Sequence, residues 1–271
     1  MPPADAGFNG TISGKLMRYK AYMKKHLLLF LLLVSTVLLK AQGSVKDSVF
    51  RIMMVSVHFS GQIPQGDMAK RYGANLAVGG TYTWKTKKNV LFGTEVSYFF
   101  GRNLKEDPLA GMRVAETGQL VDNEGYPADL RLTERGWNVY ANAGYLFSKL
   151  GHNPNSGLMV TMGAGWMQHK IKFYDPNKKV AAVNGDLKKG YDRLSGGFAL
   201  SQYIGYQYLS NNRLTNFNVG FEFYEGFTKS MRGYNYDTGL ADTKQRLDIM
   251  IGFRIAWTLP LYKRLKDFYY N

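Results

Sequence analysis

The sequence predicts an all-β fold, an eight-stranded antiparallel up-and-down β-barrel that spans a membrane, with short turns at one rim and long loops at the other. Three observations favour it. Apolar and polar residues alternate strictly in many segments, the connections alternate between short and long, and no apolar run after residue 41 is long enough for a membrane-spanning helix. The abundance of Gly (30) and Tyr (19) suits strands with an aromatic surface, and the absence of Cys excludes disulfides and thiolate metal sites.

The N-terminal residues have the pattern of an export signal. Residues 23–41 combine a basic head, a largely apolar run of 13 residues from Leu27 to Leu39, and a small residue at the end. A transmembrane anchor is the alternative, but it needs roughly 20 apolar residues. We therefore expect a cleaved signal peptide and a barrel domain over residues 42–271, with residues 1–22 being an over-extended gene start.

Strand-like alternation is clearest near the C-terminus, in QRLDIMIGFRIAWTLPLY (residues 245–262). From Leu247 onward its odd positions are all apolar, whereas its even positions include two arginines and an aspartate. Successive side chains of a strand point to opposite faces, so this segment has one apolar and one polar face. Seven more segments show the same pattern, at residues 51–62, 74–84, 89–101, 136–147, 158–169, 198–208 and 215–226.

The apolar face of these strands is expected to contact lipid. Unpaired backbone groups cost several kcal/mol each in hydrocarbon, so only helices or closed barrels span membranes. Short connections follow the second, fourth and sixth strands, and longer ones lie near residues 61–73, 102–131, 174–192 and 229–243. Short turns are typical of the periplasmic rim of an outer-membrane barrel, and long loops of its extracellular rim.

Aromatic residues near the ends of the apolar faces predict the two interfacial girdles of such a barrel. For any one of them, ordinary core packing is the alternative, but as a set they favour the girdle. The predicted girdle residues are Trp84, Trp137, Tyr145, Trp166, Tyr206, Trp257 and Tyr262.

The polar faces predict a charged interior. Eight strands leave a lumen just wide enough for side chains, so a porin is not expected. Glu95, Glu222 and Arg254 fall near mid-strand, with Asp248 and His58 nearer the outer rim. A final hairpin centred near residue 238 would bring Arg254 beside Glu222, with Glu95 as a third member. We expect this network to be structural rather than a path for protons or ions.

The whole mature chain resembles the small OmpA/OmpX-like outer-membrane β-barrels, particularly those of Bacteroidota. The resemblance rests on the signal peptide, the eight strands, the short turns and the aromatic-rich last strand, although the tail continues past Tyr262. It implies a structural or surface-binding barrel, or an accessory of a secretion complex of the PorT-like, type IX kind. Residues 65–73 and 188–197 look motif-like, but they indicate no activity.

Some barrels of this kind are lipid A-modifying hydrolases or acyltransferases that use a Ser and a His. Here His58 and Ser60 lie two apart on one strand face, but the sequence offers no carboxylate to orient the histidine. The other histidines show no metal spacing, and the acidic loop at residues 122–129 lacks the regular spacing of a calcium loop. We therefore expect a non-enzymatic protein without metal or cofactor, and keep a lipid A-modifying enzyme as the alternative.

Charge indicates the partners. Residues 1–41 hold six of the 35 Lys and Arg and one of the 20 Asp and Glu, which leaves 29 minus 19, or +10, for the mature chain. Basic proteins often bind nucleic acid, but export argues against that partner. Outer-membrane lipids and lipopolysaccharide are expected instead, together with a protein partner at the extracellular loops or the periplasmic rim.

Overall fold

The computed structural model describes residues 49–210 and 215–262, with only the backbone of Tyr262. The predicted signal peptide, the upstream extension, the tail after Tyr262 and the Tyr262 side chain of the predicted girdle lie outside the described residues. No helix within the described ranges has the length and hydropathy to cross a membrane.

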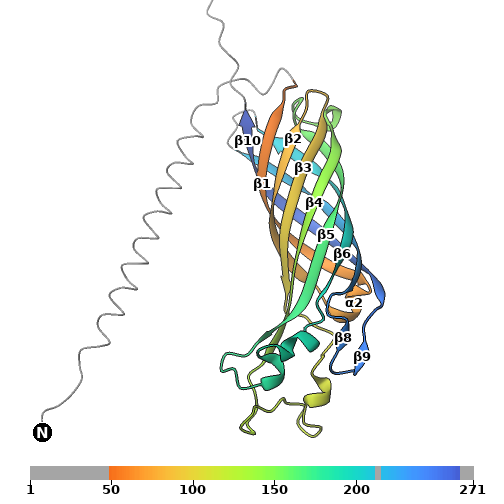
Figure 1. Cartoon of the computed structure of the whole chain (residues 1–271). Helices are drawn as coiled ribbons and strands as arrows, with labels where there is room; N and C mark the ends of the chain where they lie inside the picture. The colour runs from red at the N-terminus through yellow and green to blue at the C-terminus, as the bar shows by residue number, and fades with distance from the viewer. Residues whose placement is uncertain (1–48, 211–214, 263–271) are drawn as a thin grey trace, which may run out of the picture. The chain divides into compact units, whose positions relative to one another are not determined.

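Eight antiparallel strands close into one barrel, which confirms the predicted fold class (Figure 1). Each strand pairs with its neighbours in the chain, and the last strand pairs with the first, so the sheet has no free edge. The strands are β1 (Ile52–Gly66), β2 (Asn75–Lys85), β3 (Val90–Gly101), β4 (Arg131–Phe147), β5 (Gly157–Tyr174), β6 (Ser195–Leu209), β7 (Asn216–Ser230) and β10 (Gln245–Tyr262).

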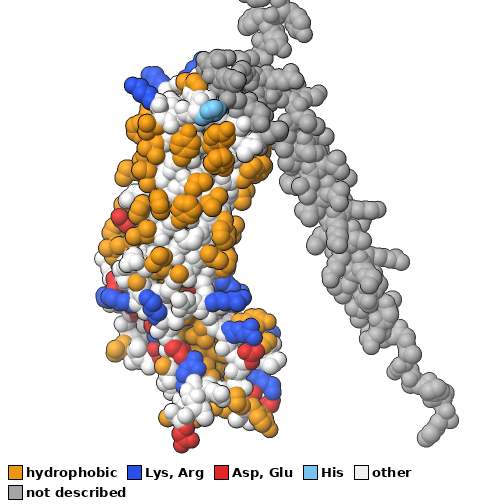
Figure 2. All heavy atoms as spheres, turned by 180° about the vertical axis from the view of Figure 1, so that it is seen from behind, with side chains coloured by type: hydrophobic (Ala, Val, Ile, Leu, Met, Phe, Trp, Pro, Cys, Tyr) orange, Lys and Arg blue, Asp and Glu red, His pale blue; other side chains and the backbone are white. Residues whose placement is uncertain are grey.

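Side chains alternate across the wall as the sequence predicts. On β10, Phe253 is 44% exposed and Ile255 is 55% exposed, whereas Arg254 and Ala256 between them are buried. Figure 2 shows hydrophobic side chains over the wall and Lys and Arg side chains at its two ends. The barrel is therefore apolar outside and polar inside, as a closed sheet in hydrocarbon requires.

The connections divide the barrel into two rims. Short links at residues 86–89 and 148–156 form the short-loop rim, where the 3₁₀ helix η2 (Ser148–Leu150) and the adjoining ends of β6 and β7 lie. The long loops at residues 67–74, 102–130, 175–194 and 231–244 form the long-loop cap at the other end (Figure 1). The cap contains α2 (Met68–Arg71), η1 (Ala110–Met112), η3 (Ala181–Val183), η4 (Leu187–Gly190) and the two-stranded β8 (Tyr234–Asn235) and β9 (Leu240–Ala241).

The register fixes the height of each residue in the wall. A path that starts at Ser56 of β1 and steps through paired residues crosses all eight strands. It returns to β1 at Gly66, which lies ten residues nearer the cap than Ser56. Positions of equal height therefore shift by about 1.25 residues from one strand to the next. On this basis Trp137 and Trp166 share one level near the cap, and Phe253 lies between that level and the level of Trp257 nearer the short-loop rim.

Apolar clusters close both ends of the lumen. At the short-loop rim, Ile52, Met54, Leu91, Leu146 and Leu209 pack together inside the barrel. Towards the cap, a second cluster includes Met68 and Tyr72, which come from and follow α2. Polar side chains fill the space between these two clusters.

Candidate functional site

Arg254 is the centre of the polar lumen. Its Nε donates to Glu222 Oε2 at 2.5 Å, and its Nη2 and Nη1 donate to the two carboxylate oxygens of Glu95 at 2.5 and 3.1 Å. All three side chains are at least 94% buried, so the guanidinium forms a charge-assisted clamp between two strands far apart in sequence. The structure thus brings together Arg254, Glu222 and Glu95.

Further side chains complete this cluster. Tyr224 Oη donates to Glu95 Oε1 at 2.6 Å and accepts from Arg254 Nη2 at 2.6 Å, and the Tyr203 ring lies 5.1 Å from the guanidinium carbon. Gln62 Nε2 donates to Glu222 Oε1 at 2.6 Å. These three residues occupy inward positions, so the alternation pattern carried a signal for them, although the sequence alone did not show which charges they meet.

A glycine makes room for the clamp. A Cβ added to Gly252 would lie 2.8 Å from Glu222 Oε1 and 3.0 Å from Gln62 Cγ. A larger residue at this inward position would force the Glu222 or Gln62 side chain to shift.

His58 lies deeper in the lumen than the sequence predicted. The strand β1 continues to Gly66, four residues beyond the predicted end, so His58 lies at the level of Arg254. Its Nε2 contacts Ser97 Oγ at 2.9 Å. Both residues are buried, and a cavity of about 30 Å³ lies beside His58 and Arg254, which is room for a water molecule or two.

His58 and Ser60 do not form a catalytic pair. Within the described residues, Ser60 Oγ and His58 Nδ1 have no hydrogen-bond partner, so the serine does not contact the histidine and no carboxylate orients the ring. A nucleophile of this type needs both contacts. Their position in a closed lumen also keeps them from lipid headgroups.

Asp248 belongs to a separate group near the cap. His169 Nε2 lies 2.9 Å from Asp248 Oδ2, Thr228 Oγ1 donates to the same oxygen at 2.5 Å, and His169 Nδ1 faces Tyr72 Oη at 3.3 Å. The threonine contacts the carboxylate rather than the imidazole, so the group does not have the arrangement of a nucleophile activated by a histidine. It ties β5, β7 and β10 together and holds Tyr72 across the mouth of the barrel.

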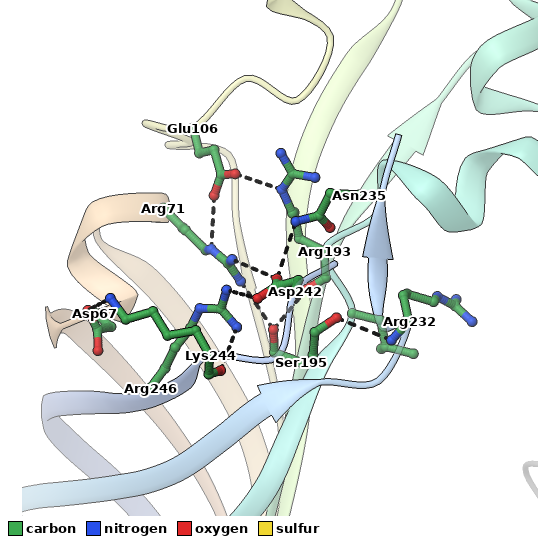
Figure 3. A network of polar contacts seen from close by, with 12 residues as sticks. Asp67, Arg71, Glu106, Arg193, Ser195, Arg232, Asn235, Asp242, Lys244 and Arg246 are labelled. Atoms are coloured by element: carbon green, nitrogen blue, oxygen red, sulfur yellow. Dashed lines mark hydrogen bonds and ion pairs between the residues drawn. The ribbon is translucent and has the colours of Figure 1, made fainter. Parts of the chain in front are cut away.

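Above this group, ion pairs join the long loops (Figure 3). Glu106 bridges Arg71 of α2 and Arg193, at 2.9 and 2.7 Å. Arg193 also donates to both carboxylate oxygens of Asp237, at 2.8 and 2.5 Å. Four cap segments therefore meet at buried arginines.

Arg71 connects the same network to Asp242. Arg71 Nη1 donates to Ser195 Oγ at 3.1 Å, and its Nη2 lies 3.9 Å from Asp242, whose other oxygen accepts from Arg246 at 2.5 Å. Arg71 and Arg193 belong to residues 65–73 and 188–197, the two motif-like stretches of the sequence. In the structure they join the cap segments to one another, and the loop sequence gave no signal for these partners.

The backbone of Arg193 has a φ of +50°, in the left-handed region that non-glycine residues rarely adopt. The carboxylates of Glu106 and Asp237 hold the side chain of this residue on both sides. The ion pairs thus stabilise a strained backbone position.

Acid is expected to loosen the cap. Burial opposes ionisation of Asp237 and Asp242, but hydrogen bonds and the charges of Arg193 and Arg246 hold the pKa of each carboxyl below its usual value. A lowered pKa gives stability that is complete above the unfolded value of about 3.9 and is lost as pH falls through the folded value. Spin labels at Thr117→Cys and Thr238→Cys should therefore show a narrow distance distribution at neutral pH, and this distribution should broaden as the pH falls from about 3.9 through the lower pKa values of the folded carboxyls.

Two controls accompany this measurement. Labels at Lys87→Cys and Lys149→Cys, on the short-loop rim, should keep their distance over the same range. With Asp237→Asn in the cap pair, broadening should already appear at neutral pH. A cap pair that stays narrow at a pH low enough to protonate Asp237 and Asp242 in the folded protein would contradict the role of these carboxylates.

The cap also has an apolar core of its own. Leu109, Leu120, Val180, Val183 and Tyr191 are buried together, although they come from two loops. Loops are usually mobile because they bury little apolar surface, so a buried cluster of this kind indicates an ordered cap.

The acidic loop takes part in this order. Asp122 Oδ1 accepts hydrogen bonds from the backbone N–H groups of Glu124 and Tyr126, both at 2.9 Å, and Lys179 pairs with Glu124 at 2.7 Å. No cluster of metal-ligating side chains occurs in the part of the chain that the structure describes.

The predicted girdle residues lie on the outer wall. Trp84, Trp137, Tyr145, Trp166 and Trp257 are exposed there, and Tyr206 is half-buried. By the height relation given above, Trp84, Tyr145, Tyr206 and Trp257 form a level near the short-loop rim.

These features define a class of protein: a transmembrane β-barrel with a side-chain-filled lumen and an ordered loop cap. No protein-family model and no curated protein matches the sequence. Among solved structures, the chain is similar to Ail, the attachment invasion locus protein of Yersinia pestis, in complex with the heparin analogue sucrose octasulfate. The identity is 9% and the TM-score 0.41, over 77% of this chain and 99% of that chain.

Two further structures from Pseudomonas aeruginosa are similar. The outer membrane protein OprG has 10% identity and a TM-score of 0.35, over 80% of this chain and 99% of that chain. The N-terminal β-barrel domain of OprF has 13% identity and a TM-score of 0.32, over 75% of this chain and 96% of that chain. At these identities and TM-scores, the similarity supports no inference about the function of this chain.

Proposed function

We propose that this chain is an integral outer-membrane protein that acts without catalysis and binds its target through the long-loop cap. The observation that carries the proposal is the contrast between the barrel lumen and the long-loop cap. The lumen is closed at both ends by apolar clusters, whereas the four long loops are joined into one ordered surface by ion pairs and a core. A rigid surface loses less conformational entropy on binding than mobile loops do.

The proposed route to the membrane follows from the sequence. Residues 23–41 act as a signal peptide, residues 1–22 are not part of the functional protein, and the chain from Gln42 onward assembles as an OmpA/OmpX-like barrel of the Bacteroidota type. The short-loop rim then faces the periplasm and the cap faces the exterior. N-terminal sequencing of the membrane-extracted protein should give Gln42, and a chain that still begins at Met1 or Met23 would contradict this processing.

Exposed side chains on the two rims give a matched test of where the partner binds. Tyr126 and Leu240 in the cap are 66% and 67% exposed, and Leu150 on the short-loop rim is 66% exposed. A photo-reactive amino acid at each position would be activated in intact cells, and the adducts would be identified by mass spectrometry. We expect adducts from Tyr126 or Leu240 and none from Leu150.

The other outcomes favour the rival functions. Adducts from Leu150 alone would favour an accessory of a secretion complex, PorT-like and type IX, that binds at the periplasmic rim. A change in lipid A acyl chains on deletion of the gene would favour the lipid A-modifying enzyme. Either result would overturn binding through the cap.

A further inference from the structure

A basic cleft lies on the outer wall where the barrel meets the cap. Its volume is about 550 Å³, and it lies between the cap ends of β4 and β5 and the loop at residues 175–194. Arg135, Lys170 and Lys172 line it on the strands, and Lys178, Lys188 and Lys189 line it on the loop.

Most of this positive charge is not neutralised by the protein. The two acidic residues of the cleft already have partners: Asp192 binds Arg232 at 2.6 Å, and Asp175 accepts from Val180 N and Asn184 Nδ2, both at 2.9 Å. Within residues 49–210 and 215–262, Lys170 and Lys188 form no ion pair, and neither do Lys172 and Lys178. The cleft therefore favours an anion that offers several oxygen acceptors.

The height of the cleft points to a lipid headgroup. Arg135 lies two residues above Trp137 on β4, and Lys170 lies four residues above Trp166 on β5, which is roughly 7 and 13 Å along the strands. Both tryptophans belong to the girdle, which marks the edge of the hydrocarbon. The cations therefore lie just above the acyl chains, where the phosphates of a leaflet are found.

A depression in the outer wall lies nearer the membrane centre than the basic cleft does. It has a volume of about 420 Å³, and Ala141, Ala143 and Ala164 of β4 and β5 line it together with neighbouring residues of these two strands and of β6. Six residues separate Arg135 from Ala141, roughly 14 Å in height for strands tilted at about 45°, close to half of a hydrocarbon core of about 30 Å. The small side chains thus lie where an acyl chain of one leaflet ends.

We propose that the cleft and the depression form one binding site for a phosphorylated lipid of the outer leaflet. The headgroup phosphate lies among Arg135, Lys170, Lys172 and Lys188, and an acyl chain lies against Ala141 and Ala164. The bound lipid supports the cap from the side, because its phosphate joins the barrel wall to the loop at residues 175–194. The assignment of this site to the outer leaflet rests on the proposed function, but binding of a phosphorylated lipid does not depend on it.

Binding can be measured on the full chain in nanodiscs of phosphatidylcholine, titrated with lipid A. The variant Lys170→Gln, Lys172→Gln, Lys188→Gln removes three charges and should weaken binding on the order of a hundredfold. The matched control Lys87→Gln, Lys88→Gln, Lys149→Gln removes three exposed charges from the short-loop rim and should leave binding unchanged. Heat-dependent gel migration shows that every variant is folded.

A second pair of measurements separates the lipid from a soluble anion. Filling the depression with Ala141→Phe and Ala164→Phe should weaken lipid A binding while leaving the affinity for inorganic phosphate unchanged. Equal binding by the cleft variant and the wild type would overturn the site. Phosphate that competes as well as lipid A, with no effect of the two phenylalanines, would overturn the lipid as ligand. Because purified protein is used, neither outcome depends on the partner found in cells.

Discussion

Replacing Arg254 with methionine is expected to lower the free energy of unfolding by about 3 to 5 kcal/mol. The change leaves Glu95 and Glu222 buried without their shared cation, and it removes the donor to Tyr224. Desolvated carboxylates without a partner are far more costly than the loss of the ion pair itself. Denaturant unfolding of the refolded barrel in micelles, followed by heat-dependent gel migration, measures the effect.

A compensated variant distinguishes lost charge balance from lost packing. Combining Arg254→Met with Glu95→Gln and Glu222→Gln removes all three charges and keeps similar volumes, so most of the stability should return. If the single Arg254→Met variant unfolded at the wild-type denaturant concentration, the clamp would not stabilise the barrel. If the triple variant were no better than the single one, packing rather than charge would explain the loss.

The neighbouring substitution Phe253→Lys is expected to destabilise the membrane-inserted barrel by about 2 to 4 kcal/mol. Phe253 is the next residue on β10, but its side chain points outward, between the levels of the two sets of girdle aromatics. A lysine there must place its ammonium group in hydrocarbon or reach to the interface. Reversible folding into lipid vesicles, followed by tryptophan fluorescence, gives the free energy.

The same substitution nearer the cap is the matched control. Leu247 is also exposed and outward on β10, with 41% of its surface accessible, but it lies beyond the level of Trp137 and Trp166. Leu247→Lys should therefore cost only about 0 to 1 kcal/mol, because the charge reaches water. Equal costs at the two positions would show that the wall does not face lipid, and would remove the physical basis of the fold assignment.

Alternation along the strands was sufficient to predict much of the barrel. A period of two is a local property, so Phe253 and Arg254 could be assigned to opposite faces from their spacing alone. The prediction of Arg254 beside Glu222 needed only the centre of one hairpin, because the two strands are adjacent in sequence. Strand ends were less well predicted: β1 and β4 extend beyond their apolar runs, which shifted the predicted height of His58.

Other contacts depend on closure and on loop packing. Glu95 was predicted only as a possible third member of the pair formed by Arg254 and Glu222, because it reaches Arg254 from β3 across the lumen and no spacing in the sequence fixes that contact. Arg71, Glu106 and Arg193 lie in three different loops without a repeating pattern. The basic cleft likewise exists only because the loop at residues 175–194 folds back beside β4 and β5.

Residue parity alone predicts a wall of strands with an apolar exterior, since side-chain direction on a strand depends only on that parity. Only the folded chain shows how Tyr224 and Gln62 complete the Arg254 cluster, how the long loops join into a cap, and where the cationic cleft lies above the girdle. The reason is physical. Those contacts join residues distant in the chain, and their partners are set by the ten-residue stagger of the closed sheet and by the packing of one loop on another.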